Sequence, residues 1–389
     1  MSAILPGGAI GILGGGQLGR MTAMAARSLG YRVQVLDPDA ACPARWVADA
    51  CVTAEFDDAR AAAGLARACD VVTFEIEKVG LETLRAAEAF APVRPGRELL
   101  ALVQDKLVQK EWLAAQGFPV GPFRPARTEP ELGPALDALG GRCFVKAAVG
   151  GYDGRGQVET RSAADAASAW KELGGAPALV ERALELEAEL SIMVARRPGG
   201  EVAVFPPALN HHEQRILAWS LLPAPLPPEL LRRARELAEG LAGALGLEGL
   251  LAVELFLTRA GELFVNELAP RPHNTFHATE RGCVTSQFEQ HVRAVCDLPL
   301  GDPSLVRPAA IVNLLGEVWL AGKAAAFAQV LAIPGVRLHL YEKRVPKPGR
   351  KMGHLSALAE TPEEAVRRVQ EAGRLLGIAG EAWAGSLRG

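Results

Sequence analysis

The chain is poor in cysteine and asparagine, and it contains no long apolar run. No two of its six cysteines have CxxC spacing, which argues against a zinc ribbon or a disulfide framework and favours small core residues in a reducing compartment. No run of about 18 apolar residues predicts a membrane span, and residues 1–9 lack the basic and apolar regions of a signal peptide. We therefore expect a cytoplasmic protein with no membrane partner.

The chain also lacks an excess of basic residues. It has 42 Lys and Arg against 45 Asp and Glu, for a formal net charge of −3. General nucleic-acid binding requires many cations against the phosphate backbone, so we expect no nucleic-acid partner. Four asparagines and 27 prolines would suit either a heat-adapted protein or a GC-rich genome, and both interpretations stay open.

The composition and length predict a folded protein of several domains. Hydrophobic residues make up 49% of the 389 residues and charged residues 22%, which excludes disorder and predicts two or three domains. Apolar runs at 9–13, 32–36 and 71–74 alternate with a helical pattern at 17–29. Strands separated by helices predict a parallel, doubly wound α/β sheet in the first third.

The rest of the chain has more strand-like segments and no internal repeat. Strands are predicted at 143–147, 178–181, 189–195, 251–257, 263–268, 311–314 and 336–341. Helices are predicted at 104–116, 228–245 and 362–376.

The first glycine-rich motif, Gly14-Gly15-Gly16-Gln17-Leu18-Gly19, follows a predicted strand and opens a predicted helix. Such a turn can hold a phosphate with backbone N–H groups, and Asp37 lies where a dinucleotide site places its ribose-binding carboxylate. Three interpretations stay open: a nicotinamide cofactor, another phosphate ligand, or a tight structural turn.

A second glycine-rich loop, 150–156, follows Lys146 at the end of a predicted strand. It contains four glycines together with Tyr152, Asp153 and Arg155. Converging backbone N–H groups flanked by cations are typical of a phosphate-binding lid, whereas the alternative is a plain β-hairpin loop.

Two glutamates form a candidate metal site. A two-residue turn at Ala260-Gly261 would place Glu254 directly opposite Glu267 on neighbouring strands. Like charges in register are destabilising, and a shared magnesium ion with Asn266 as a further oxygen ligand would remove the conflict. Glutamine at either position should then preserve or raise the stability of the metal-free fold. Two solvated glutamates are the alternative.

Polar and basic residues follow in two further segments. Pro270-Arg271-Pro272-His273-Asn274 comes directly after the second glutamate strand, whereas His212 has weaker support for a role. The segment 343–351 gathers five cations around prolines and a glycine. Because the chain is acidic overall, a single phosphate fits this basic loop better than a nucleic acid.

These motifs together resemble the ATP-grasp enzymes, and specifically the 5-(carboxyamino)imidazole ribonucleotide synthase family of purine biosynthesis. The resemblance is carried, in order along the chain, by GGGQLGRM at 14–21, TFEIE at 73–77, KAAVGGYDGRGQ at 146–157, NELAPRPHN at 266–274, TSQFEQH at 285–291 and GRKMGH at 349–354.

The resemblance implies an ATP-grasp fold of mixed α/β class. It implies an N-terminal Rossmann-like domain at 1–103, an ATP-grasp domain at 104–305 with a lid at about 120–180, and a small C-terminal domain at 306–389. It also implies ATP and Mg²⁺ as cofactors, aminoimidazole ribonucleotide and bicarbonate as substrates, carboxyphosphate as intermediate, and a homodimer.

The resemblance assigns roles to residues by motif. Candidate ATP-binding residues are Lys106, Lys146, Gly151, Gly154, Gly156, Glu181, Glu189 and Asn266, and candidate metal ligands are Glu254 and Glu267. Candidate catalytic residues are Asp153, Arg271, His273 and Asn274. Candidate substrate-binding residues are Gly16, Gln17, Glu75, Tyr152, Arg155, Lys343, Arg350 and Lys351.

The sequence departs from the family pattern at three places. Thr275-Phe276 replaces Ser-Gly, Arg215 stands where we expect glycine, and the basic loop is one residue longer. Alternatives are another ATP-grasp ligase with an acyl-phosphate intermediate, a nicotinamide-dependent dehydrogenase and a nucleotide sensor without turnover.

Overall fold

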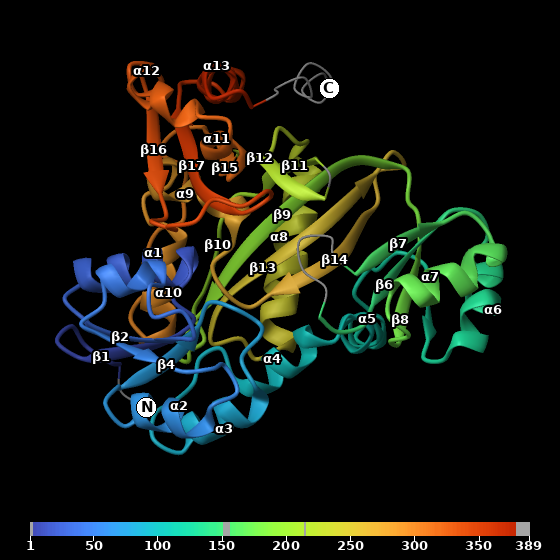
Figure 1. Ribbon diagram of the computed structural model, residues 1–389, viewed down its shortest axis with the longest axis horizontal. Coiled ribbons are helices and arrows are strands. Elements are labelled where there is room, and N and C mark those ends of the chain that lie inside the picture. The colour runs from blue at the N-terminus through green and yellow to red at the C-terminus, as the bar shows by residue number, and fades with distance from the viewer. Residues whose placement is uncertain (1–2, 151–155, 214, 379–389) are drawn as a thin grey trace.

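The computed structural model describes residues 3–150, 156–213 and 215–378. Figure 1 shows an N-terminal α/β unit on one side, a small sheet with its own helices on the other, and a long twisted sheet between them that continues into the C-terminal region. No helix of the described segments is long and apolar enough to cross a membrane.

The N-terminal unit is the parallel sheet that the sequence predicts. Its strand order is β3-β2-β1-β4, and all three pairings are parallel. The prediction missed the short strand β3. The strands are β1 (Ala9–Leu13), β2 (Arg32–Asp37), β3 (Ala50–Thr53) and β4 (Val71–Phe74). The helices are α1 (Gln17–Ser28), α2 (Ala59–Ala66), α3 (Leu81–Glu88) and α4 (Arg97–Gln104).

The central and C-terminal regions share one nine-stranded sheet. Its order is β14-β13-β9-β11-β12-β15-β17-β16, with β10 also paired to β9. Because β12 pairs antiparallel with β15, the C-terminal strands extend the central sheet instead of forming a sheet of their own. The strands are β9 (Leu186–Arg196), β10 (Val202–Val204), β11 (Ala208–Glu213), β12 (Ile216–Leu222), β13 (Gly249–Thr258), β14 (Leu263–Ala269), β15 (Ala309–Leu315), β16 (Val336–Leu340) and β17 (Lys351–Leu358).

Helices flank this long sheet, and one apolar core joins it to the N-terminal unit. The largest buried cluster includes Leu13 of β1, Leu190 of β9 and Leu355 of β17. The helices are α5 (Lys106–Ala115), α8 (Pro228–Ala244), α9 (Thr279–Gly282), α10 (Gln287–Val295), α11 (Glu317–Leu320), α12 (Phe327–Leu331) and α13 (Pro362–Leu375).

A third sheet lies apart from the other two (Figure 1). Its order is β5-β8-β6-β7, with a separate apolar cluster between the sheet and its helices. Lys146 of β6 pairs with Gln157 of β7, so the second glycine-rich loop is the connection of a β-hairpin. The elements are β5 (Phe123–Ala126), α6 (Glu129–Leu139), β6 (Cys143–Ala147), β7 (Gln157–Thr160), α7 (Ala166–Glu172) and β8 (Ala178–Arg182).

The helix predicted at 104–116 is wrong at its start. Asp105 is extended, and its carboxylate accepts hydrogen bonds from the backbone N–H groups of Leu107 (2.9 Å) and Val108 (3.0 Å). Aspartate is a preferred helix N-cap, so α4 ends and α5 begins at this residue. The consequence is that Lys106 is the first residue of a helix.

The β13–β14 hairpin reaches the predicted pairing by a different route. Thr258 N donates to Glu262 O (2.9 Å), and Gly261 has a φ of 77°, so the turn has three residues and the predicted two-residue turn is wrong. A register shift between Glu254 and Leu255 then places one extra residue, Asn266, in β14. This bulge restores the predicted pair Glu254↔Glu267.

The first glycine-rich turn is closed by two carboxylates of the chain itself. Asp37 accepts from Gly15 N (2.7 Å), and Glu75 accepts from Gly16 N (2.7 Å) and Gly19 N (3.1 Å). A Cβ on Gly16 would lie 2.6 Å from the Glu75 carboxylate. The glycines therefore make room for a buried glutamate, which supports the structural-turn interpretation.

Glu75 should make the stability of this unit depend on pH. Burial raises the pKa of Glu75 to about 7, against hydrogen bonds from Gly16 and Gly19. The folded chain therefore favours the neutral carboxyl group more than the unfolded chain does. The contribution of this group to the free energy of unfolding is lost as the pH rises through 7, because the carboxyl group then ionises in the folded chain. At 1.36 kcal/mol per pKa unit the loss is about 3 kcal/mol.

The comparison is between the wild type and Glu75→Gln, which cannot ionise. The Tm of the wild type relative to this variant should fall as the pH rises from about 5 to about 8. Glu82→Gln, at a surface position paired with Arg85, is the control and should follow the wild type at every pH. Parallel curves for the wild type and Glu75→Gln would contradict the prediction.

Candidate functional site

The candidate residues converge at the β13–β14 hairpin, where the beginning of α5 and the strands β6 and β8 of the small sheet approach it. Three side chains form the innermost cluster. Glu181 on β8 lies between two lysines, with Oε1 2.8 Å from Lys110 Nζ and Oε2 2.6 Å from Lys146 Nζ. Lys110 also donates to the carbonyl oxygens of Val265 (3.1 Å) and Asn266 (3.0 Å). This cluster joins the small sheet, α5 and β14.

The cluster is an electrostatic unit. Burial alone would raise the pKa of Glu181, but Lys146 and Lys110 hold it at about 2. Burial lowers the pKa of Lys110, whereas Glu181 and Glu267 outweigh burial and raise the pKa of Lys146. Glu181 therefore stays ionised and keeps the Lys146 ammonium charged at the edge of the site.

The predicted metal pair has two different environments. Lys106 Nζ lies 2.6 Å from Glu267 Oε1, and this cation overcomes the effect of burial and lowers the pKa of Glu267. Burial and the neighbouring Glu267 instead raise the pKa of Glu254. The predicted repulsion between the two carboxylates therefore raises the pKa of Glu254, whereas the negative charge of Glu267 is compensated by Lys106.

The bulge in β14 brings Asn266 to the same site as both glutamates. Neighbouring residues of a regular strand point to opposite faces. Here Asn266 Nδ2 donates to Glu254 Oε2 (3.2 Å), and Lys146 Nζ donates to Asn266 Oδ1 (3.4 Å). Two carboxylates and an amide are therefore gathered on one face of the hairpin.

Arg271 and His273 follow β14 directly. Arg271 Nε donates to Glu77 Oε1 (2.7 Å), across 194 positions of sequence. His273 Nδ1 lies 2.9 Å from Thr275 Oγ1, and Nε2 lies 3.5 Å from Glu254 Oε1. Burial, with the charges of Arg271 and Lys351, lowers the pKa of His273 well below 6.5, so its imidazole is neutral at neutral pH.

Asn274 is buried, and its Oδ1 lies 3.1 Å from His277 Nε2. The next two residues are the departure from the family pattern. Phe276 is fully buried and packs against Phe205 with ring centroids 6.2 Å apart. This aromatic side chain therefore fills the core behind the turn and does not narrow the site.

Glu189 and His212 face each other on neighbouring strands. Glu189 Oε2 lies 2.6 Å from His212 Nδ1, and this carboxylate raises the pKa of His212 against the effect of burial. Arg215, in the turn after β11, has a φ of 68°. This left-handed conformation favours glycine, which is the residue that the family pattern places there. Its guanidinium donates to Gln157 O (2.8 Å) at the start of β7.

The basic loop is only partly directed at the site. The charge of Lys351, at the start of β17, contributes to the lowered pKa of His273 and opposes the net rise in the pKa of His212, so it acts on the site. Arg350 donates to Val345 O (2.8 Å) within the loop, and the Lys343 ammonium lies 5.8 Å from the centre of the Tyr341 ring.

Five candidate residues lie outside the described residues: Gly151, Tyr152, Asp153, Gly154 and Arg155. At the end of this loop, Gly156 O accepts a hydrogen bond from Ala147 N (2.8 Å). At the first glycine turn, Gly16 and Gln17 are both half-buried.

Sequence reasoning missed Lys110 and Glu77 as parts of the site. Lys110 lies four positions after Lys106, and this spacing places both lysines on one face of a helix. That signal was available in the sequence. Glu77 lies within the TFEIE string, but its pairing with Arg271 depends on the tertiary fold, so no local pattern indicates it.

Replacing Lys110 with methionine should destabilise the protein. The change keeps the unbranched shape of the side chain at one atom shorter, but it removes one of the two cations on Glu181 and the donor to two carbonyl oxygens. Loss of one partner from a buried ion pair costs about 3–5 kcal/mol. We expect a large fall in Tm, measured by thermal unfolding at neutral pH.

Lys171→Met, at an exposed position on α7, is the matched control and should leave the Tm nearly unchanged. An equally small effect of Lys110→Met would show that Glu181 does not require the second lysine.

Comparison with known proteins matches three stretches of the chain to family models. Models of three families match the chain: the ribonucleotide synthetase preATP-grasp domain at residues 8–104, the ATP-grasp domain at 111–288, and the phosphoribosylaminoimidazole carboxylase C-terminal domain at 309–368.

Relatives match over nearly the whole chain. The N5-carboxyaminoimidazole ribonucleotide synthase of Bacillus subtilis is 40% identical, covering 94% of this chain and 95% of its own length. A crystal structure of such a synthetase in complex with ADP has a TM-score of 0.92 and 42% identity, covering 97% of this chain and 99% of that one. The enzyme from Aspergillus clavatus in complex with ADP and 5-aminoimidazole ribonucleotide has a TM-score of 0.89 and 32% identity, covering 95% and 98%. This chain is an ATP-dependent carbon–nitrogen ligase, and it belongs to the N5-carboxyaminoimidazole ribonucleotide synthase family of ATP-grasp enzymes.

Proposed function

We propose that the chain uses ATP and bicarbonate to carboxylate 5-aminoimidazole ribonucleotide in purine biosynthesis. The products are N5-carboxyaminoimidazole ribonucleotide, ADP and phosphate. The observation that carries the proposal is the convergence of Lys106 and Lys146 with Glu254, Glu267 and the Arg271 turn. The two lysines would bind phosphate groups, the two glutamates would supply oxygen ligands for a metal ion, and Arg271 would bind the substrate that is phosphorylated. Formation of an acyl phosphate requires these three functions in one place.

The lysine cluster would bind the nucleotide. Lys106 and Lys146 are the candidate ligands of the α- and β-phosphates. Glu181, held between Lys110 and Lys146, orients the Lys146 ammonium, and the backbone after Glu181 would meet the adenine. Glu189 would contact the ribose hydroxyl groups. The loop 150–156 would close over the γ-phosphate.

Magnesium fits the donor set of Glu254, Glu267 and Asn266. These are hard oxygen ligands, and the repulsion from Glu267 that helps to raise the pKa of Glu254 supports a cation between the two carboxylates. When bound, magnesium neutralises charge on the phosphate oxygens during transfer.

The chain's own residues would then guide the acyl step. A bicarbonate oxygen attacks the γ-phosphorus, the bond to ADP breaks, and carboxyphosphate forms. Arg271, held by Glu77, would bind the carboxyl oxygens, while the neutral His273 can accept a proton. Asn274 lies beside them. The exocyclic amine of the ribonucleotide then captures carboxyphosphate, or CO₂ released from it, and phosphate leaves.

The ribonucleotide would lie between the N-terminal turn and the basic loop. Gln17 and Glu75 would contact it from the turn, while Gly16 contributes by the absence of a side chain beside Glu75. Lys351, Arg350 and Lys343 would bind the 5′-phosphate. Tyr152, Asp153 and Arg155 would complete the site from the second glycine-rich loop.

We also propose that the enzyme acts as a homodimer in the cytoplasm, in line with the family. Light scattering coupled to size exclusion tests the oligomeric state directly.

Release of ADP is the test of the reaction. With ATP and magnesium present, ADP release should rise strongly when both the ribonucleotide and bicarbonate are added, and it should fall when either is omitted. ATP binding without any turnover would indicate a nucleotide sensor instead. ATPase activity that does not respond to the ribonucleotide would indicate a different ATP-grasp ligase.

The Glu254→Gln and Glu267→Gln variants should differ in the stability of the metal-free fold. This replaces the expectation from the sequence that either change preserves or raises that stability. Without metal, Glu254→Gln should preserve or raise the Tm, because it removes the repelled carboxylate. Glu267→Gln should lower the Tm, because Lys106 loses its partner. Since the Glu267 side chain is 43% exposed, that loss should not exceed about 1 kcal/mol.

The two variants should behave alike in catalysis. Each should reduce turnover by at least about 100-fold, as expected when a main electrostatic stabiliser is lost. The double variant should be little worse than either single one, because one ion needs both ligands. Turnover of all three across a magnesium titration is the measurement. Strictly multiplicative losses would show that the glutamates do not share an ion.

A further inference from the structure

A second group of metal-ligating side chains lies away from the nucleotide site. Within residues 3–150, 156–213 and 215–378, one group of three His, Cys, Asp or Glu side chains brings its ligand atoms within 4.8 Å of one another: Glu280, His339 and His354. Glu280 Oε2 lies 3.6 Å from His339 Nδ1 and 4.0 Å from His354 Nε2. Two imidazoles and one carboxylate are a ligand set that zinc uses in proteins.

The three ligands come from three different elements. Glu280 is on α9, directly after the Arg271–His277 turn, His339 is on β16, and His354 is on β17. The strand pairing places His339 opposite His354, so both imidazoles lie on one face of the sheet. Their side chains are 19% and 2% exposed, and that of Glu280 is 32% exposed. The set is therefore largely shielded, but Glu280 faces an opening.

A hydrogen bond fixes the orientation of His354. Tyr341 Oη lies 2.8 Å from His354 Nδ1, on the side of the ring away from Glu280. When Nδ1–H donates to this hydroxyl oxygen, the lone pair on Nε2 is directed to Glu280. Ligating histidines in metal sites are held by such a partner on the other ring nitrogen.

The ring of His354 also packs against two other imidazoles. His354 is stacked between His277 (centroids 4.6 Å apart) and His339 (5.1 Å). The rings of His339 and His354 are within 13° of parallel, so an ion in the plane of both requires one ring to tilt. His339 is the more exposed of the two.

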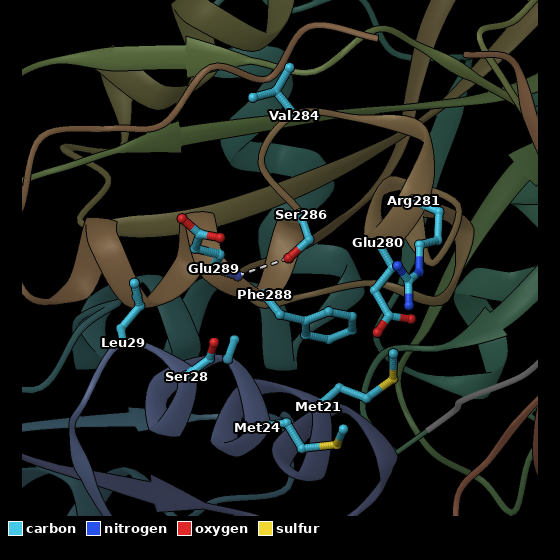
Figure 2. A pocket seen from close by; sticks show the side chains of 11 residues that line it. Met21, Met24, Ser28, Leu29, Glu280, Arg281, Val284, Ser286, Phe288 and Glu289 are labelled. Atoms are coloured by element: carbon cyan, nitrogen blue, oxygen red, sulfur yellow. Dashed lines mark hydrogen bonds between the residues drawn. The ribbon is translucent and has the colours of Figure 1, made fainter. Parts of the chain in front are cut away.

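A pocket opens beside Glu280, one of the three residues. It has a volume of about 290 Å³ and lies between α1 and the α9–α10 segment. Glu280 lines it, together with Met21 and Phe288, and Figure 2 shows these three side chains next to one another at one end of the pocket. An ion can therefore reach the carboxylate from solvent.

We propose that Glu280, His339 and His354 form a binding site for a divalent transition-metal ion of the zinc class, separate from the nucleotide site. Three protein ligands leave one position for water from the pocket. An ion here joins α9 to the β16–β17 hairpin, whose connection is the basic loop. Binding therefore stabilises the junction between the central and C-terminal parts of the sheet.

The experiment uses the full-length protein, freed of metal with a chelator and then dialysed. Excess magnesium is kept in the buffer to occupy the oxygen ligands of Glu254 and Glu267. Titration calorimetry with zinc should show one site, and zinc at about 100 times its Kd should raise the Tm by a few degrees. Cobalt bound in place of zinc should give the visible absorption bands that are typical of an ion with a low coordination number.

Variants assign the site to these residues. His339→Gln and Glu280→Gln should each weaken zinc binding by more than about tenfold, and Tyr341→Phe by about tenfold through the orientation of His354. His211→Gln removes a histidine from another His–Glu pair (3.5 Å) and should bind zinc like the wild type. If a histidine variant does not fold, the Glu280→Gln variant still tests the proposal, because the Glu280 side chain is partly exposed and its replacement should not disturb the core. No binding, or equal binding by wild type, Glu280→Gln and His339→Gln, would overturn the proposal.

Discussion

The site depends on how each partly buried carboxylate is compensated. Glu181 has two lysines, Glu267 has Lys106, and Glu77 has Arg271. A charge withdrawn from water needs such a partner, because desolvation otherwise neutralises it. Glu254 faces Asn266 and a neutral His273 instead, and its pKa rises. The chain thus fixes its lysines and arginine with dedicated carboxylates, whereas Glu254 keeps the repulsion of Glu267 at the point proposed for magnesium.

Hydrophobic periodicity predicted most of the frame, because it depends on local patterns. The parallel N-terminal sheet and the hairpin of Glu254 and Glu267 follow from strand runs and turn residues. The pairing of the two glutamates was predicted correctly although the turn was wrong. The turn is one residue longer than predicted, which moves the strand register by one residue. The bulge at Asn266 moves the register back by one residue, so Glu254 still lies opposite Glu267. A bulge is a tertiary adjustment, and the sequence carries no direct signal for it.

The parts that could not be predicted are contacts between distant segments. The Arg271–Glu77 pair and the Lys110–Glu181 pair join different sheets or domains. The glycine-rich turn shows the opposite difficulty. Its pattern is shared by phosphate sites and by tight turns, and only the position of Glu75 shows that the turn's N–H groups at Gly16 and Gly19 are already satisfied. A glycine pattern indicates donors that are available, but the fold determines what they bind.

The continuity of the central sheet explains how distant substrate groups can be recognised together. Because β12 pairs with β15 and β15 with β17, Lys351 is fixed by the same sheet that carries Glu254 and Glu267. Arg20 of α1 pairs with Glu342 beside the basic loop (3.1 Å), which ties that loop to the N-terminal unit as well. The residues proposed for the ribonucleotide phosphate and for the ATP phosphates thus share one frame. The small sheet has an apolar core of its own and meets this frame through the ion pairs of Glu181 with Lys110 and Lys146.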